Sequence, residues 1–374
     1  MTTQIRIVLG ALAVSVLATA GPGEAAQAPA GAKVSGKAAE KPGALARTPW
    51  GDPDLQGTWT TDSAFGIPLQ RPDQFAGRGE LTDEEFKQKL ERDTRTRTTA
   101  ENAIGSFRND GAWLTRTFRQ TSLIVEPADG KLPPLTPEGE RRRQFAPRGT
   151  YGEGPLDGPE DFTLYDRCIT LGVVGSLTPK IYGNGHRIIQ APGYVVIMNE
   201  MIHESRVIPL DGRPHAGKSI RMYMGDGRGH WEGQTLVVET TNLNGKPNYS
   251  GVEGRITERF TRVESELLLY EATIDDPKTY TRTLKIAIPL TSPPGYQVLP
   301  YDCHEGNSAV YASLGGQRAE DRAIEEDRTK GIIRPRRSIQ ENLNAGGRPV
   351  GEAPPASGAA APASAAPAAT TPAR

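Results

Sequence analysis

The sequence predicts a mostly β protein, with an antiparallel meander forming a barrel or a strongly curved sandwich and a few surface helices. Roughly nine strand-like segments follow one another between residues 187 and 301, and short turns rather than helices join them. Such an array must cover or remove its edges, which favours closure of the sheet. The chain, at 374 residues, is long enough for one large or two small domains.

Residues 1–20 have the features of a signal peptide. Arg6 precedes an apolar run over 7–17, and Ala18-Thr19-Ala20 fits the small-x-small rule for cleavage. The run is shorter than the roughly 20 residues that a membrane span needs. We therefore expect an exported protein, periplasmic or secreted, with no membrane span.

Two terminal segments are predicted to be disordered, 21–46 as a leader and 346–374 as an Ala/Pro-rich tail. Both have few large apolar residues, so neither buries enough surface to offset the entropy of ordering.

Residues 47–160 form the predicted N-terminal part, with a short strand near 55–60 and surface helices. Thr82 and Glu85 make a capping box that opens a helix over 83–100, and Thr136-Pro137 opens a second helix.

Residues 161–316 form the predicted β section, and 317–345 a charged terminal helix with a docking segment. Gly225 to Gly229 is expected to be a hairpin loop, since it lies between two predicted strands and precedes no helix. The expected strands are 187–190, 194–202, 206–210, 219–224, 235–243, 255–263, 267–274, 280–290 and 296–301.

The segment 280–290 alternates strictly, which places Tyr280 and Arg282 on the face of Leu284 and Ile286. A cation on a core face needs a partner or a polar cavity. Three interpretations stay open: a structural pair with Glu258 or Glu239, recognition of a carboxylate or developing oxyanion, or a wrong face assignment near the strand end.

Cys168 and Cys303 are the two cysteines of the chain. In an oxidising compartment a lone pair of cysteines predicts a disulfide, and two buried free thiols are the alternative.

Composition and motifs exclude several classes of protein. The net charge is −1, from 44 basic and 45 acidic residues, so no overall charge attracts nucleic acid or an anionic membrane. The sequence has no G-x-S-x-G, phosphate-binding loop, H-E-x-x-H or C-x-x-C. We expect no cofactor, and the histidine spacing neither indicates nor excludes zinc, so no metal ligand is assigned.

Two of the five histidines stand beside a glutamate, as His203-Glu204 and His304-Glu305. A disulfide at Cys303 would hold His304 in a fixed turn, a suitable position for an acid or base. The predicted catalytic residues are His203, His304, Arg282 and Glu305, and the predicted ligand-binding residues are Tyr280, Glu204, His215 and Trp231.

Several segments resemble an uncharacterised family of exported bacterial proteins. They are Pro53-Asp54-Leu55-Gln56-Gly57-Thr58-Trp59, Arg167-Cys168, Pro192-Gly193-Tyr194-Val195-Val196-Ile197, Asp211-Gly212-Arg213-Pro214-His215, Trp231-Glu232-Gly233-Gln234-Thr235-Leu236-Val237-Val238 and Cys303-His304-Glu305-Gly306-Asn307. The resemblance covers about residues 48–320 and implies one exported unit. It lends no catalytic residue, since no activity is known for that family. Gly57-Thr58-Trp59 is also similar to the start of lipocalin-like barrels.

These observations predict a cofactor-free hydrolase or lyase that acts on a small or oligomeric organic substrate in a polar-lined barrel or groove. The alternative is a non-catalytic carrier or binding protein for a small ligand, and a third interpretation is an envelope protein that binds other proteins. Converging His, Glu, Tyr and Arg side chains favour chemistry, whereas an apolar cavity with one polar group favours carriage. The sequence predicts no oligomeric state.

Overall fold

The computed structural model describes residues 46–102, 114–144, 146, 156–247 and 249–335, with the backbone alone over 97–102. The predicted signal peptide and the predicted disordered tail lie outside these ranges, as does the predicted leader except for its last residue.

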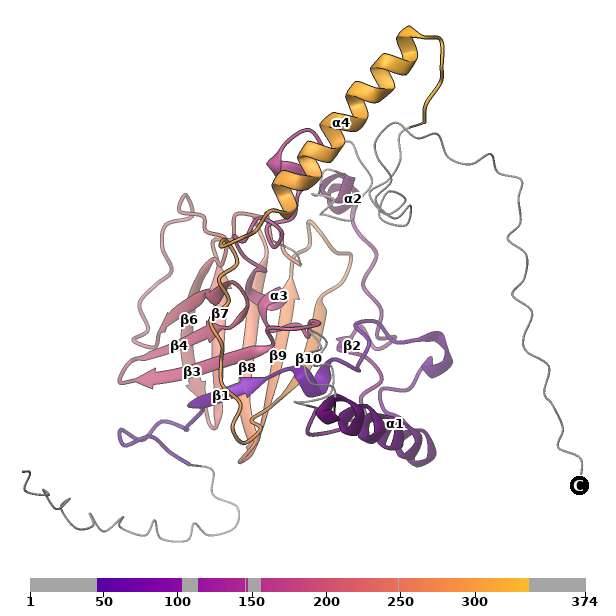
Figure 1. Ribbon diagram of the computed structural model, residues 1–374. Helices are drawn as coiled ribbons and strands as arrows, with labels where there is room; N and C mark the ends of the chain where they lie inside the picture. Colours follow the sequence, from indigo (N-terminus) through magenta and orange to yellow (C-terminus); the bar gives the residue numbers. More distant parts are fainter. Residues whose placement is uncertain (1–45, 103–113, 145, 147–155, 248, 336–374) are drawn as a thin grey trace, which may run out of the picture. The chain divides into compact units, whose positions relative to one another are not determined.

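Ten antiparallel strands form one sheet, which curls into a nearly closed barrel with one open seam (Figure 1). The predicted fold class is therefore confirmed. The strands are β1 (Gly57–Thr60), β2 (Ile124–Glu126), β3 (Gly185–Ala191), β4 (Tyr194–Asn199), β5 (Ser205–Pro209), β6 (Asp226–Glu232), β7 (Thr235–Thr241), β8 (Arg255–Glu264), β9 (Leu267–Asp275) and β10 (Leu284–Thr291).

The sheet consists of two meanders joined by a short strand from far upstream. Its order is β5-β4-β3-β1-β10-β9-β8-β7-β6, with β2 paired to β10 beside this path. β1 pairs with β3 along its length and with β10 through Thr60 and Thr291. The open seam consequently lies between β5 and β6.

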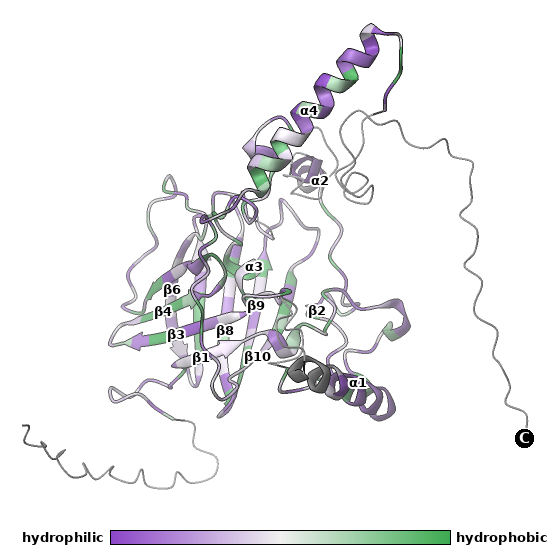
Figure 2. Cartoon of the chain, viewed as in Figure 1, coloured by the Kyte–Doolittle hydropathy of each residue, from purple (hydrophilic) through white to green (hydrophobic). Residues whose placement is uncertain are grey.

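Side chains from alternate positions of the strands fill the barrel interior. In β9 the residues at even positions are buried and their neighbours are half-buried, as period-2 alternation requires. The same alternation gives the mixed apolar and polar colouring of the strands in Figure 2. The largest fully buried side chains on the strands are Trp59, Tyr270, Phe260, Ile124, Ile197, Ile208, Leu236 and Leu268.

The region around β6 differs from the prediction. The expected strand 219–224 is irregular apart from a bridge between Met222 and Leu243, whereas 226–232, expected to be partly loop, is a strand. Glycine explains the difference, because a Cβ at Gly229 would lie 2.6 Å from Leu210 Cδ2 and 3.0 Å from Ile208 Cγ2. Glycine therefore lets β6 approach the β5 side chains across the seam.

Strand β10 begins at Leu284, later than predicted. The predicted inward set Leu284, Ile286, Ile288 and Leu290 is buried. The prediction that Arg282 faces the core is wrong, since its side chain is 54% exposed and its Nη2 lies 3.4 Å from Asp129 Oδ2.

Backbone contacts before β10 give the reason. Tyr280 N–H donates to Asp276 O, and Thr281 N–H donates to Pro134 O, so the chain is still turning where alternation suggested a strand. The expected strand 296–301 is also irregular.

In the described part of the chain, four α-helices lie outside the sheet: α1 (Asp83–Asn102), α2 (Pro137–Gln144), α3 (Val173–Leu177) and α4 (Ala309–Thr329). The predicted capping box is confirmed, because Glu85 N–H donates to Thr82 Oγ1 and Thr82 N–H donates to Glu85 Oε2. The described part of α1 is largely hydrophilic (Figure 2). Within the described ranges, no helix combines the length and the apolar character needed to cross a membrane.

The predicted disulfide is confirmed, with Cys168 and Cys303 bonded and 135 residues apart in sequence. In the chain-entropy model, a cross-link over a loop of this length stabilises the fold by roughly 5 kcal/mol.

We expect reduction, or replacement of both cysteines by serine, to lower the free energy of unfolding by several kcal/mol, because the unfolded chain regains the entropy that the cross-link removes. Urea unfolding with and without reductant measures this difference. The double serine variant is the control, since reductant should leave it unchanged. Equal stability of the reduced and oxidised protein would contradict the prediction.

Candidate functional site

The segments 165–170, 180–186, 199–206 and 296–307 meet around the Cys168–Cys303 bond, and we call this region the disulfide end. Long-range contacts hold it together. Asn307 Nδ2 donates to Asp166 O at 3.1 Å, and Tyr296 Oη donates to Glu200 Oε2 at 3.0 Å.

His203, a predicted acid or base, lies at this end with an exposed side chain. Its Nδ1 lies 2.8 Å from Tyr301 O. A carbonyl oxygen only accepts, so Nδ1 carries the proton and Nε2 has a lone pair in the neutral ring. The contact fixes one tautomer, with Nε2 as the basic atom.

The backbone beneath His203 is strained. Ile202 has φ of 62° and His203 has φ of 42°, both in the left-handed region. A β-branched residue rarely adopts this conformation, and such strain persists only where the surroundings hold it. Cys168, in the disulfide, has φ of 55°. Three strained residues therefore gather at one end of the barrel.

Three tyrosines lie next to this strained segment. The rings of Tyr182 and Tyr301 are 6.0 Å apart, and Tyr165 Oη lies 3.3 Å from Tyr182 Oη. Burial is the main cause that raises the pKa of both Tyr165 and Tyr301, so both hydroxyls stay protonated at neutral pH. Ile181 and Leu299 are exposed at the same end. Together they form a surface of rings and hydroxyl donors.

Glu200 anchors the segment that carries Tyr296. Its carboxylate accepts from Gly185 N–H at 2.9 Å, Tyr296 Oη at 3.0 Å and Leu299 N–H at 3.0 Å. A Cβ at residue 185 would lie 2.6 Å from Glu200 Oε2, so glycine allows this approach. A buried carboxylate with several donors is satisfied without a metal or a cation in contact.

A lysine and a carboxylate lie beside Glu200. Lys180 Nζ donates to Ser176 O and Thr178 O, both at 2.8 Å. Burial lowers the pKa of Lys180 to about 7, against the attraction of Asp62 and Glu200. Asp62 accepts from Asn184 Nδ2 at 2.8 Å, and burial raises its pKa. A lysine that exists partly as the free amine at neutral pH is an unusual group in a folded protein.

His186 lies inside the barrel next to this cluster. Its Nδ1 donates to Asn199 Oδ1 at 2.9 Å, and its buried Nε2 has no hydrogen-bond partner. Burial, and then the charge of Lys180, lowers the pKa of His186 to about 3. This histidine is neutral at any physiological pH.

The barrel interior contains a buried ion pair. Arg206 of β5 donates from Nη1 and Nη2 to the two oxygens of Glu258 on β8, at 2.7 and 2.8 Å, and Tyr270 Oη donates to Glu258 Oε1 at 3.1 Å. The interpretation that Arg282 pairs with Glu258 or Glu239 is wrong, since Arg282 pairs with Asp129 and the partner of Glu258 is Arg206. This pair connects the seam strand β5 to the opposite wall.

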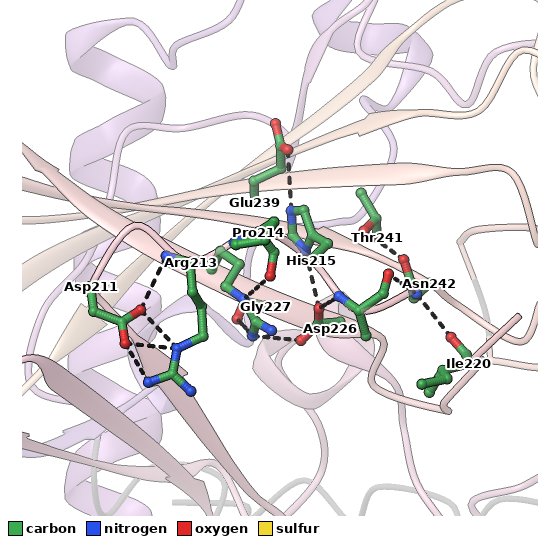
Figure 3. A network of polar contacts seen from close by, with 12 residues as sticks. Asp211, Arg213, Pro214, His215, Ile220, Asp226, Gly227, Glu239, Thr241 and Asn242 are labelled. Carbon is green, nitrogen blue, oxygen red and sulfur yellow. Dashed lines mark hydrogen bonds and ion pairs between the residues drawn. The ribbon is translucent and has the colours of Figure 1, made fainter. Parts of the chain in front are cut away.

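His215, a predicted ligand-binding residue, belongs to a separate network at the loop between β5 and β6 (Figure 3). Its Nδ1 lies 3.3 Å from Asp226 Oδ2, and its Nε2 lies 3.4 Å from Glu239 Oε1. Only the imidazolium donates both bonds at once, since the neutral ring has one N–H. Arg228 and Arg255 pair with the same two carboxylates. The network tethers the loop to β6 and β7.

The other predicted site residues do not form one cluster. His304 and Glu305 follow the disulfide and are exposed. Glu204 accepts from Thr170 Oγ1, and burial raises its pKa. Trp231 is half-buried against the core, and its Nε1 has no partner. Tyr280 is half-buried, and burial raises its pKa to about 12.

Sequence reasoning missed Asp62, Lys180, Glu200, Arg206 and Tyr296. Glu258 gave a usable signal, because it stands two residues from both Ile256 and Phe260 in the predicted strand 255–263 and so shares their face. Lys180 and Asp62 gave none, since each is an ordinary charged residue outside the predicted strands. Across the described residues, no three His, Cys, Asp or Glu side chains are arranged to hold a metal ion.

Comparison of the chain with protein-family models, with curated proteins and with solved structures finds no match.

We expect Arg206→Met to lower the free energy of unfolding by about 3–5 kcal/mol, because Glu258 would be left buried without its cation. The double variant Arg206→Met/Glu258→Leu should recover most of this loss. Urea unfolding compares them, with Arg213→Met at an exposed pair as the control. An unchanged Arg206→Met variant would contradict a buried pair.

Lys180 should make stability depend on pH in a defined direction. Its pKa is about 7 when folded and 10.5 ordinarily, so between these values the unfolded chain binds more protons. The unfolding free energy of the native protein should rise relative to Lys180→Met as pH increases from 7 to 10. Urea unfolding across this range tests it, with the exposed Lys218→Met as the control. A constant difference for Lys180→Met would refute the assignment.

Proposed function

We propose that this protein is an exported, cofactor-free hydrolase or lyase that acts on a small or oligomeric organic substrate at the disulfide end. The observation that carries the proposal is His203, whose Nδ1 is bonded to Tyr301 O at 2.8 Å on a backbone with φ of 42°. This arrangement supplies a general base at Nε2 with a fixed tautomer and position.

The strain at Ile202 and His203 supports a functional role for this segment. Left-handed backbone at non-glycine residues costs of order 1–3 kcal/mol each and is concentrated at active sites. Replacement by an unstrained turn would stabilise the fold, so the strained form is informative. The disulfide to Cys303 holds the neighbouring segment 296–307 in place while His203 acts.

The tyrosines give the rest of the proposed chemistry. In a hydrolysis, His203 Nε2 takes a proton from the attacking water, and a tyrosine hydroxyl donates a hydrogen bond to the oxygen that gains charge. The bond to the leaving alcohol then breaks, and the imidazolium gives its proton to that alcohol. In an elimination, the same nitrogen takes the proton from the carbon next to an electron-withdrawing group, the bond from the neighbouring carbon to its oxygen leaving group breaks as the double bond forms, and the imidazolium returns the proton to that oxygen. The rings of Tyr182 and Tyr301 offer faces on which a substrate ring can stack.

Of the other predicted catalytic residues, His304 and Glu305 border this surface and serve as additional polar groups in the proposal. Arg282 has no part in it, because its guanidinium is exposed and pairs with Asp129.

Export to the periplasm or the medium belongs to the same proposal. It is supported by the signal-like residues 1–20 and by the Cys168–Cys303 disulfide, which persists in an oxidising compartment.

A non-catalytic binding protein is the second candidate. The exposed surface of Tyr182, Ile181 and Leu299 favours it, since such rings and apolar side chains hold a ligand without reacting. The two candidates differ in catalysis: an enzyme turns its substrate over and needs His203 to do so, whereas a binding protein holds the ligand unchanged.

We expect His203→Gln to lower turnover by about 10²-fold or more. The glutamine amide fills the place of the imidazole ring but is not basic, so the general base is lost. The full chain is assayed on p-nitrophenyl esters, p-nitrophenyl glycosides and uronate polysaccharides, the last by absorbance of unsaturated products. His230→Gln, at an exposed histidine of β6, is the matched control and should keep native rates.

Native turnover in the His203→Gln variant would overturn this role for His203. Binding of these compounds without any turnover by the native protein would favour the carrier.

A further inference from the structure

Lys180 is a half-buried lysine that the proposed hydrolysis or elimination does not use. It lies just after α3, and the next two residues, Ile181 and Tyr182, are 55% and 48% exposed. The segment that carries this amine therefore runs along the surface of the molecule, where a small reagent can reach it.

Asn184 holds the backbone of Lys180 in a fixed turn. Its Oδ1 accepts from Lys180 N–H at 2.8 Å, and its Nδ2 donates to Lys180 O at 2.7 Å. The same Nδ2 donates to Asp62 Oδ1 at 2.8 Å, so one buried amide anchors both the lysine and a carboxylate. A reacting group on a fixed backbone loses little entropy in the reaction.

The hydrogen bonds of Lys180 Nζ match those of a neutral amine. A neutral amine has two N–H donors and a lone pair, whereas an ammonium has three donors. Nζ donates to Ser176 O and Thr178 O, both at 2.8 Å, and no carboxylate of the described residues lies within ion-pair distance of it. Both N–H groups of the neutral form are consequently bonded, which leaves the lone pair for a reaction. Burial, which lowers the pKa of this amine to about 7, agrees with this form.

The titratable groups around Nζ favour a positive charge that forms there. Asp62 and Glu200 attract such a charge, and each carboxylate is held by hydrogen bonds of its own. Tyr296 donates to Glu200 and stays protonated, because burial raises its pKa. His186 stays neutral, because burial lowers its pKa to about 3. A cation formed from the neutral amine is therefore stabilised by two fixed carboxylates.

We propose that Lys180 is a covalent binding site for a small aldehyde, which it holds as an iminium. A desolvated lysine amine is a nucleophile toward carbonyl carbon. An aldehyde suits a half-buried amine, because its carbonyl carbon is the least hindered. The inference goes beyond the proposed function and does not depend on His203.

The reaction needs only the amine, the aldehyde and a proton from solvent. The lone pair of Nζ forms a bond to the carbonyl carbon, and one amine proton moves to the oxygen to give a hydroxyl. This hydroxyl takes a proton from solvent and leaves as water while the C=N bond forms. The iminium keeps one N–H for a backbone carbonyl, and its charge lies near Asp62 and Glu200.

Reductive trapping of the native full chain with glycolaldehyde and cyanoborohydride tests the proposal. Hydride from cyanoborohydride converts the iminium to a stable secondary amine, and peptide mass spectrometry locates it. At pH 7 we expect labelling of Lys180 to be about tenfold or more faster than that of the exposed Lys218, since solvent-exposed lysines are almost fully protonated there. At pH 9 this ratio should fall about tenfold or more, because exposed amines gain much more of the free form.

The dependence on aldehyde concentration separates a site from a merely reactive amine. The labelling rate at Lys180 should saturate with glycolaldehyde, whereas that at Lys218 should rise linearly. Lys180→Arg should remove the fast-labelled fraction and Lys218→Arg, the matched control, should keep it. Melting temperatures confirm that both variants are folded.

These measurements need no turnover, so they stand apart from the test of His203. Labelling of Lys180 no faster than Lys218 would show that the lysine only caps α3, and it would overturn the proposal. A linear dependence at Lys180, an unchanged ratio at pH 9, or a fast-labelled fraction that persists in Lys180→Arg would each overturn it as well.

Discussion

The hydrogen bonds of β1 are the constraint on which the barrel depends. Four residues, Gly57–Thr60, join the two meanders, because β1 pairs with β3 along its length and with β10 through Thr60 and Thr291, while β2 pairs with another part of β10. Without β1, this edge of β3 would be unpaired. Trp59 fixes the strand, since it is 1% exposed and its Nε1 donates to Leu55 O at 2.9 Å. Asp62 follows directly and bonds Asn184 before β3, so closure of the sheet also builds the polar cluster with Lys180.

Alternation was sufficient to predict strands in which every inward position carries an aliphatic or aromatic side chain. β9 is one example, with Leu268, Tyr270, Ala272 and Ile274 inward. β6 was missed because Gly227 and Gly229 occupy inward positions, and a residue without a side chain gives no hydrophobic period. Hydrophobic alternation therefore cannot predict a strand such as β6, in which glycines at the inward positions leave room for side chains of the neighbouring strand.

The partners of charged residues were also difficult to predict from the sequence, because they come from distant parts of the chain. A pair of Arg282 with Glu258 or Glu239 was one interpretation of the sequence, and the structure contradicts it, because Glu258 pairs with Arg206, which the sequence analysis did not single out. The start of β10 depends on contacts of Tyr280 and Thr281 with Asp276 and Pro134, and local alternation does not contain them. The candidate site divides in the same way. His203 was identified from its residue type, but its carbonyl partner at Tyr301 is 98 residues away and becomes adjacent only in the fold.

The open seam has a consequence for motion. β5 and β6 end the strand order, so across the described chain these two strands lack a ladder partner on one side. Thermal opening of a sheet begins where the fewest backbone hydrogen bonds must break. Local opening of the barrel is therefore expected at the seam between β5 and β6 rather than evenly around the sheet. Two tethers limit the amplitude: Arg206 holds β5 to β8, and His215 holds the connecting loop to Asp226 and Glu239. The strands at the seam, β5 and β6, thus move with limited amplitude, while β8 to β10, which are paired on both sides, stay in place.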